Sequence, residues 1–315
     1  MTAPLLDVRG LSHDFHLKDG RTLHAVDGVD LAVETSEILG IVGESGCGKS
    51  TLGKTLIGVL RADQGTVRFE GTPIQHLTGT ARRAVRSRFQ YVYQDSGAAL
   101  DPRWTIGRSL DEALVIHTAL SRPERDARVR ETLAAVGMRE EQLSLYPHEI
   151  SGGQQRRIGL ARVLALHPRL LILDEPTSGL DVSVQATILK LLIALWKQYG
   201  LTLLFISHDL AVVRSICTRV AVMYLGRIVE VGPTAGVFAN PRHPYTRSLL
   251  AAVPVPGGRR VIDEAWLEGE PPDPLAIPSG CRFRNRCPMA QPLCASDDPA
   301  LRPLAPGHDA ACHFA

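Results

Sequence analysis

The stretch Gly43-Glu-Ser-Gly-Cys-Gly-Lys-Ser50 decides the fold of this 315-residue chain. It matches the pattern G-x-x-x-x-G-K-S, in which glycines let backbone amides turn inward around phosphate groups and a following helix directs its N-terminus at them. The apolar run Ile38–Val42 before it is typical of a buried strand, and the stretch from Ser50 to Leu60 has a helical pattern. The context therefore predicts a phosphate-binding loop in which Lys49 contacts β- and γ-phosphates and Ser50 contacts Mg²⁺.

A second apolar run ends in two carboxylates. Leu170–Leu173 predicts a buried strand, and Asp174 and Glu175 follow at its carboxyl end, where open α/β sheets place their chemistry. Asp174 is expected to hold Mg²⁺, directly or through water, and Glu175 to polarise an attacking water as a general base. The alternative is a strand that merely runs into a polar turn.

Residues 1–235 alternate strand-like and helical patterns, which predicts an α/β layered domain. Leu23–Val33 and Thr66–Phe69 alternate as half-buried antiparallel strands do, whereas Leu203–Ile206 is a continuous apolar run typical of a buried parallel strand. Apolar residues recur with helical spacing from Val184 to Leu195, and Gly200 fits the end of that helix.

Charge and hydropathy exclude several classes of protein. The 35 basic and 33 acidic residues nearly cancel, so nothing demands a nucleic acid or an anionic membrane. The run Arg82, Arg83, Arg86 and Arg88 has no aromatic platform beside it, which favours a solvated helix face over a nucleic-acid site. No signal peptide is visible, and no apolar stretch approaches the roughly 20 residues of a membrane helix. We expect a soluble cytoplasmic protein that reaches a membrane only through partners.

Four more short motifs lie at ordered places along the chain. They are Tyr91-Val-Tyr-Gln94-Asp95, Ile150-Ser151-Gly152-Gly153-Gln154, Ser178-Gly-Leu-Asp181 and Ser207-His208-Asp209. With the phosphate loop and the carboxylate strand, they resemble the nucleotide-binding domains of ABC transporters over nearly all of residues 5–235. The resemblance implies an ABC-type P-loop ATPase domain, with a RecA-like core, an antiparallel β subdomain and a helical subdomain, that shares MgATP with a second such domain.

The resemblance also implies roles for individual residues. Gln94 would touch Mg²⁺ and water near the contact with a membrane subunit, and His208 would contact the γ-phosphate. Ser151, Gly152 and Gly153 would close on the γ-phosphate held by the opposite subunit. The expected catalytic residues are Glu175, His208 and Gln94, and the expected Mg²⁺ ligands are Ser50, Gln94 and Asp174. The expected nucleotide contacts are Gly43, Glu44, Ser45, Gly46, Cys47, Gly48, Lys49, Ser50, Thr51, Phe15, Asp174, Ser151, Gly152, Gly153, Gln154 and Asp181.

Two positions depart from the family pattern or leave it open. Ile150 stands where the family usually has Leu, a near-isosteric apolar change. The aromatic side chain that stacks on adenine is not clearly marked; Phe15 is the better candidate and His16 the alternative.

Beyond Pro233, repeated prolines predict an extension over residues 236–315 with a short helix over Tyr245–Val253. Asn240-Pro-Arg-His-Pro-Tyr-Thr-Arg-Ser-Leu-Leu250 resembles the C-terminal motif of oligopeptide and dipeptide importer ATPases, a subfamily that also takes nickel and other small solutes. Near the end stand Cys281, Cys287, Cys294 and Cys312, separated by five, six and seventeen residues. Four thiolates can ligate an iron–sulfur cluster or Zn²⁺. A four-iron four-sulfur cluster is expected, with zinc or no metal as alternatives.

The sequence thus predicts an ATP-hydrolysing subunit of a binding-protein-dependent importer of di- or oligopeptides, peripheral on the cytoplasmic face of the inner membrane. Its expected partners are a second, related ABC ATPase subunit, two transmembrane permease subunits and an extracytoplasmic solute-binding protein, with no nucleic acid. One alternative is the same subunit type serving nickel or another small solute. The other is a soluble ABC ATPase acting on ribosomes or DNA, which typically carries tandem domains or a coiled-coil insertion that this chain lacks.

Overall fold

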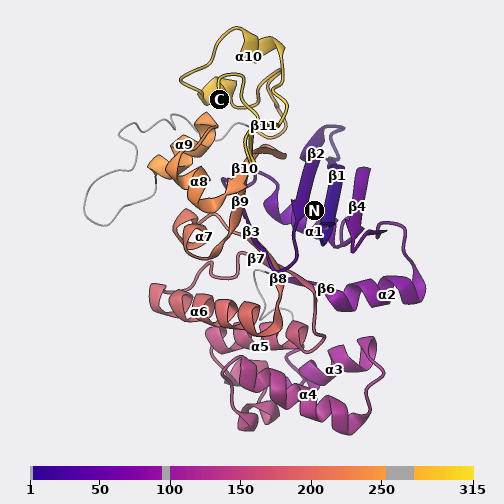
Figure 1. Cartoon of the computed structure of the whole chain (residues 1–315). Helices are drawn as coiled ribbons and strands as arrows, with labels where there is room; N and C mark the ends of the chain where they lie inside the picture. Colours follow the sequence, from indigo (N-terminus) through magenta and orange to yellow (C-terminus); the bar gives the residue numbers. More distant parts are fainter. Residues whose placement is uncertain (1–2, 94–99, 253–272) are drawn as a thin grey trace. The chain divides into compact units, whose positions relative to one another are not determined.

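The computed structural model describes residues 3–93, 100–252 and 273–315, and the chain divides into two compact units (Figure 1). The first unit is formed by residues 1–75 and 205–315, and the second by residues 76–204. The phosphate loop and the extension therefore belong to one unit. The expected domain boundary between residues 235 and 236 divides the chain differently and stays a prediction.

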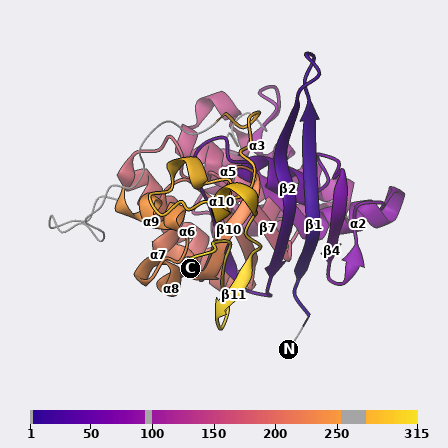
Figure 2. The same cartoon turned by 90° about the horizontal axis from the view of Figure 1, so that it is seen from above.

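An antiparallel sheet forms one part of the first unit (Figure 2). Its strands follow the order β2 (Thr22–Val33), β1 (Leu6–His16), β4 (Gln64–Phe69) and β5 (Thr72–Pro73). Leu6 is paired with Val33 on one side and with Phe69 on the other, and all three are buried. The alternation read over Leu23–Val33 and Thr66–Phe69 is confirmed, since the apolar residues of such strands gather on one face.

A second group of strands in the first unit leads into the phosphate loop. β3 (Ile38–Val42), all of whose residues are buried, runs parallel to β9 (Arg219–Tyr224). The neighbours beyond β9 are antiparallel, in the order β10 (Arg227–Pro233), β12 (His308–Ala310) and β11 (Arg302–Ala305). Because β11 and β12 come from the end of the chain, the extension adds two strands to this sheet.

The helices of the first unit are short. They are α1 (Lys49–Leu56), α7 (Leu210–Ile216), α8 (Thr234–Ala239), α9 (Pro244–Ala251), the 3-10 turn η3 (Arg284–Arg286) and α10 (Leu293–Ser296). α1 ends before the expected Leu60 because Gly58 adopts φ +71°, outside the helical region. The helix expected over Tyr245–Val253 is confirmed by α9, and its last expected residue lies outside the described residues.

The second unit is mostly helical. Its elements are α2 (Gly79–Arg88), β6 (Phe89–Val92), α3 (Ile106–His117), α4 (Arg122–Ala135), η1 (Glu140–Ser144), η2 (Pro147–Glu149), α5 (Gly152–Leu164), β7 (Leu170–Asp174) and α6 (Val182–Tyr199). β6 and β7 are parallel, with Phe89 opposite Leu170, and β7 is buried throughout. α6 ends where Gly200 turns left-handed, as the sequence predicted.

Two further elements lie where the sequence predicted them. β8 (Thr202–Ile206), which runs across the boundary between the units, is buried along its whole length. None of the ten residues of α2, all within the described part of the chain, is buried, so its arginines lie on a solvated face. Among the helices in the described ranges, none combines the length and apolar character needed to cross a membrane.

Glu230 fastens the extension to the first unit. This fully buried carboxylate accepts hydrogen bonds from the backbone amides of Arg242 (2.7 Å) and His243 (2.8 Å) and from Nε2 of His308 on β12 (2.7 Å). It therefore satisfies three donors, from two parts of the chain, in a place that water does not reach.

We expect Glu230→Ala to lower the free energy of unfolding by about 3–5 kcal/mol, because two amides and an imidazole lose their buried partner. Denaturant titration of the full chain measures the change. Glu34→Ala, at an exposed position, is the matched control and should stay within about 0.5 kcal/mol of the unaltered protein. Equal stability of the two variants would show that Glu230 does not anchor the extension.

Candidate functional site

The phosphate loop turns sharply between β3 and α1, and two of its glycines are required by close backbone contacts. A Cβ atom on Gly43 would lie 2.2 Å from the carbonyl oxygen of Met223, and one on Gly48 would lie 2.0 Å from that of Ala25. Both glycines also have positive φ, of 156° and 106°. The loop can follow this path only with glycine there, and the path exposes amides to an anion at the start of α1.

Lys49 lies across the loop. Its ammonium group is largely buried and donates to the carbonyl oxygens of Gly43 and Glu44, each at 2.8 Å. Cys47 is packed inside the same loop, where its carbonyl accepts from the amide of Gly226 (2.9 Å). Burial raises the pKa of the Cys47 thiol. The thiol is therefore a packing group in this structure, whereas the ammonium group of Lys49 is held by two carbonyls of the loop.

His208 follows β8 in a turn that is tied to β3. The amide of Ser207 donates to the carbonyl of Ile41 (3.1 Å), the residue next to the end of β3. Asp209 caps α7 by accepting from the amides of Ala211 and Val212. These contacts hold the exposed His208 in the same unit as the phosphate loop.

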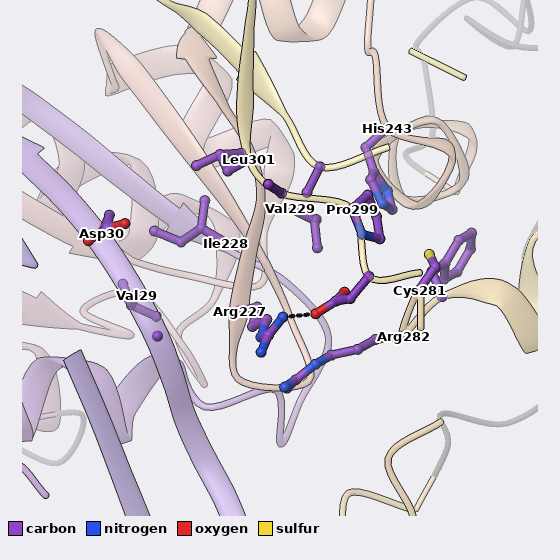
Figure 3. A pocket seen from close by; sticks show the side chains of 15 residues that line it. Val29, Asp30, Arg227, Ile228, Val229, His243, Cys281, Arg282, Pro299 and Leu301 are labelled. Carbon is purple, nitrogen blue, oxygen red and sulfur yellow. Dashed lines mark hydrogen bonds and ion pairs between the residues drawn. The ribbon is translucent and has the colours of Figure 1, made fainter. Parts of the chain in front are cut away.

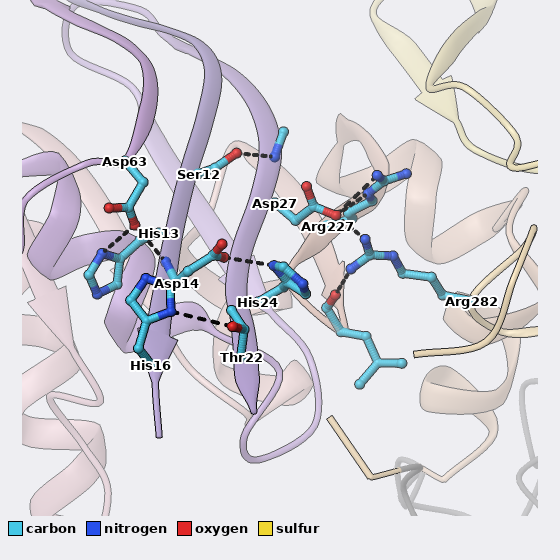
Figure 4. Close-up of polar contacts among 12 residues, drawn as sticks. Ser12, His13, Asp14, His16, Thr22, His24, Asp27, Asp63, Arg227 and Arg282 are labelled. Carbon is cyan, nitrogen blue, oxygen red and sulfur yellow. Dashed lines mark hydrogen bonds and ion pairs between the residues drawn. The ribbon is translucent and has the colours of Figure 1, made fainter. Parts of the chain in front are cut away.

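The two candidates for stacking on adenine, Phe15 and His16, lie on β1, and Figure 4 shows His16 beside Thr22. Phe15 is 37% exposed and meets the ring of His13 edge-on at 4.6 Å between centroids. His16 is also exposed, and its Nδ1 lies 3.3 Å from the hydroxyl of Thr22. Phe15 offers the larger apolar face to a base, which keeps it as the preferred candidate.

Asp174 has a partner that the sequence did not reveal. The hydroxyl of Tyr91 on β6 donates to Oδ2 of Asp174 at 2.6 Å, and both side chains are buried. Burial, together with this hydrogen bond, raises the pKa of Tyr91 far above its ordinary value, so the phenol stays protonated. Tyr91 thus orients the carboxylate. The sequence holds no signal for this hydrogen bond, because it depends on the pairing of β6 with β7. Its one local hint is that Tyr91 lies three residues before Gln94, in the same motif.

Glu175 adopts φ 50°, a left-handed conformation rare for a residue with a side chain. Such a conformation costs on the order of 1–3 kcal/mol and is found preferentially at functional sites. Arg156 on α5 donates to the carbonyls of Pro176 (2.8 Å) and Ser178 (3.2 Å), in the loop that follows. The predicted general base therefore lies in a strained turn that α5 braces.

Ile150–Gln154, which we call the signature segment, forms the capped N-terminus of α5. The hydroxyl of Ser151 accepts from the amide of Gln154 (3.4 Å), and the side chain of Gln154 accepts from the amide of Ser151 (2.9 Å). A Cβ on Gly152 would meet no described atom within 4 Å, and one on Gly153 only Cγ1 of Val184 at 3.5 Å. Packing in the described part of the chain leaves these two glycines replaceable.

The signature segment opens onto a pocket of about 600 Å³ within the second unit. Ser151, Gly153 and Gln154 line it together with Asp181, and every lining residue lies between residues 137 and 184. The structure thus brings the signature segment and the Asp181 loop to one cavity at a helix N-terminus, where anions bind favourably. Gln94, expected to contact Mg²⁺, lies outside the described residues.

The expected iron–sulfur cluster is not supported. All four cysteines of the extension lie in the described part of the chain and are free thiols. The described residues contain no group of three or more His, Cys, Asp or Glu side chains arranged to hold a metal ion. The thiols are near enough to affect one another: burial first, and then the charges of Cys294, Cys287 and Cys312, raise the pKa of Cys281 to about 11. Proximity of the thiols alone does not support a cluster, so we derive no chemistry from one.

The extension also borders a smaller pocket, of about 320 Å³, in the first unit (Figure 3). Side chains from β2, β10 and the extension surround it, among them Asp30, Arg227 and Cys281. The Arg227 guanidinium is paired with Asp27 and with Asp298 (Figures 3 and 4). Its charge is therefore already matched within the chain.

A glycine-bounded loop closed by a buried lysine, set between a buried strand and a helix, defines the class of P-loop nucleotide-binding proteins. Comparison with known proteins identifies the family within this class. Residues 26–178 match the family model of ABC transporters, and residues 229–294 match that of the oligopeptide/dipeptide transporter C-terminal region.

Individual relatives agree with the family models. The oligopeptide transport ATP-binding protein OppF of Escherichia coli is 47% identical over 94% of this chain and 92% of its own length. AppF of Bacillus subtilis, also an oligopeptide transport ATP-binding protein, is 43% identical over 98% of this chain and 97% of its own length. The solved structure of cbiO1 from Clostridium perfringens covers 76% of this chain and 92% of its own at 31% identity, with a TM-score of 0.67. The chain belongs to the ABC transporter family, among the ATP-binding subunits of its oligopeptide/dipeptide branch, and is an ATPase.

We expect Gly153→Ala to separate stability from activity. The free energy of unfolding should stay unchanged or rise by up to about 1 kcal/mol, because alanine favours the helix and its methyl group finds room. ATPase activity of the assembled protein should fall by about tenfold or more if a phosphate approaches Gly153 as the sequence predicts, because the methyl group would occupy that space.

Gly236→Ala on α8 is the matched control, since a Cβ there has its nearest contact, Nδ1 of His308, at 3.9 Å. Its free energy of unfolding should change within the same range, because alanine also favours α8, and its ATPase activity should stay unchanged. Full activity in Gly153→Ala would show that no phosphate approaches the signature segment.

Proposed function

We propose that this chain is the ATPase subunit of a binding-protein-dependent importer of di- and oligopeptides. The names of the relatives support this substrate class, since OppF and AppF are oligopeptide transport proteins and a 45% identical protein of Brucella ovis is named a putative peptide import ATP-binding protein. The match of residues 229–294 to the C-terminal region of oligopeptide/dipeptide transporters supports it independently of the ATPase domain.

The observation that carries the proposal is that the two glycines of the signature segment have room for a side chain and yet are glycine. Gly152 and Gly153 stand at a capped helix N-terminus, and Gly153 lines the pocket there, yet packing among the described residues does not require either to be glycine. Glycine at such a place allows a phosphate to approach the backbone. We therefore assign Ser151, Gly152, Gly153, Gln154 and Asp181 to the γ-phosphate of ATP held by a second ABC ATPase subunit, a related chain. The solved cassette MJ0796, 26% identical with a TM-score of 0.65, is itself dimeric.

The phosphate loop would hold this chain's own ATP. The loop amides and the helix N-terminus of α1 would surround the phosphates, with Lys49 released from the carbonyls of Gly43 and Glu44 to contact them. The donor set suits Mg²⁺: Ser50, Gln94 and the oriented carboxylate of Asp174 would hold the ion, which neutralises phosphate charge when bound. Phe15 would stack on the adenine.

Hydrolysis would proceed through Glu175. Its carboxylate would take a proton from the attacking water, while His208 would contact the γ-phosphate. The strained backbone of Glu175, braced through Arg156, supports a role that needs one fixed orientation.

The remaining partners follow from the same function. Two transmembrane permease subunits would form the path for the solute, and an extracytoplasmic binding protein would deliver it. The chain would then lie as a peripheral subunit on the cytoplasmic face of the inner membrane. A metal at the four cysteines forms no part of this proposal.

We expect Glu175→Gln to bind ATP with unchanged affinity and to lower kcat by about 100-fold or more, because the amide cannot accept the proton of water. Calorimetric ATP titration and phosphate release measure the two quantities. Glu141→Gln, an exposed carboxylate in η1, is the control. Near-normal turnover in Glu175→Gln would remove Glu175 from the mechanism.

The substrate class has its own test. In vesicles that contain the purified complete importer, binding protein loaded with a dipeptide or short oligopeptide should stimulate ATP hydrolysis and drive uptake of the labelled peptide. Stimulation by nickel alone would assign the importer to another solute. ATP hydrolysis stimulated by RNA or DNA in the absence of membranes would contradict the importer function.

A further inference from the structure

The extension reaches the phosphate loop directly through Glu44. Both carboxylate oxygens of Glu44 accept from the guanidinium of Arg286, Oε2 from Nη1 at 2.8 Å and Oε1 from Nη2 at 3.0 Å. The amide of Glu44 donates to the hydroxyl of Tyr245 on α9 at 2.8 Å. Its carbonyl accepts from the ammonium group of Lys49. Glu44 therefore links two residues of the extension to the lysine of the loop.

Arg286 has a buried side chain at the far end of this link. Its side chain is only 7% exposed, and it ends η3, inside the segment Cys281–Cys287 that we call the cysteine-flanked turn. Phe283 of the same turn is buried against the rings of Tyr224 (5.3 Å) and Tyr245 (5.5 Å). A planar guanidinium placed in this way presents both of its terminal nitrogens to one carboxylate, the strongest geometry for such a pair.

The same turn holds the loop by a second route. Arg282 donates to the carbonyl of Leu225 and pairs with Asp27 (Figure 4). Leu225 stands in the turn between β9 and β10, whose next residue, Gly226, donates its amide to the carbonyl of Cys47 in the phosphate loop. The cysteine-flanked turn thus supports the loop at Glu44 and, through one intermediate, at Cys47.

A phosphate-binding loop acts through backbone amides that must all point at one place, so its affinity depends on how firmly the backbone is held before the nucleotide arrives. We propose that Arg286 is a positioning residue for ATP: through Glu44 it fixes the phosphate loop, and this makes the extension a working part of the nucleotide site. This inference rests on the proposed role of the loop in holding ATP. Arg286 contacts no phosphate; it acts through the carboxylate of Glu44.

The first test is ATP affinity in the full chain. We expect Arg286→Ala to raise the Kd for ATP by about tenfold and Arg286→Lys by less, because lysine keeps the charge but loses the bidentate fork. In the assembled importer, the KM for ATP should rise by a similar factor while kcat at saturating ATP stays within about threefold, since ATP restores the loop once bound. A purely structural role would lower the unfolding midpoint and leave Kd and KM unchanged.

A double-mutant cycle isolates the pair. Glu44→Gln and Arg286→Gln should each raise the Kd for ATP. The Kd of the double variant should not exceed that of the more strongly affected single variant, because both substitutions remove the same interaction. Arg284→Ala is the matched control: it lies in the same turn, but its guanidinium donates to Ser279 and Ala295. It should bind ATP normally. If Arg286→Ala does not fold, Arg286→Lys and Glu44→Gln carry the test.

Lys49→Ala separates this inference from the proposed function. Loss of ATP binding in Lys49→Ala, with normal Kd in Arg286→Ala and additive effects in the cycle, would overturn the role of Arg286 while leaving the loop assignment intact. Unaltered ATP binding in Lys49→Ala would overturn the loop assignment and the inference with it. Weakened binding in Lys49→Ala and in Arg286→Ala, with coupling in the cycle, is the result we expect.

Discussion

The close approach of the phosphate loop to its neighbouring strands is the constraint on which the rest of the structure depends. Side chains are excluded at Gly43 by the backbone of β9 and at Gly48 by that of β2. Backbone contacts from these two strands therefore restrict the loop to one conformation. Glu44 adds support from a third side, because its carboxylate and amide are both engaged by the extension. A loop of small residues gains a defined shape only through such neighbours.

The extension has a corresponding place in the architecture. β11 and β12 lengthen the sheet beside β10, and the buried carboxylate of Glu230 fastens β12 through His308. Since the extension is anchored there, the cysteine-flanked turn can present Arg282 and Arg286 in fixed positions. The part of the chain that matches the oligopeptide/dipeptide model is thus packed into the unit that contains the phosphate loop.

Local patterns predicted much of this arrangement, and the contacts they missed are long-range. The strand before Gly43, the strand ending at Asp174 and the helix ending at Gly200 all follow from short-range hydropathy and turn chemistry. The Tyr91–Asp174 hydrogen bond depends on which strands pair, and Arg286 meets Glu44 across 242 positions, so neither has a local signal. The cysteine spacing indicated a cluster, but ligation also requires converging thiol directions, which spacing does not encode.

The central claim is that the signature segment serves ATP held by another subunit. It is tested most directly with an ATP analogue that carries a photoreactive group on the γ-phosphate and with a chain bearing Lys49→Ala. After illumination of the complex with the partner ATPase subunit, we expect peptide mapping to find the label between Ile150 and Arg157 of this chain, and to find none there without the partner. Labelling that requires this chain's own Lys49 and is indifferent to the partner would contradict the account.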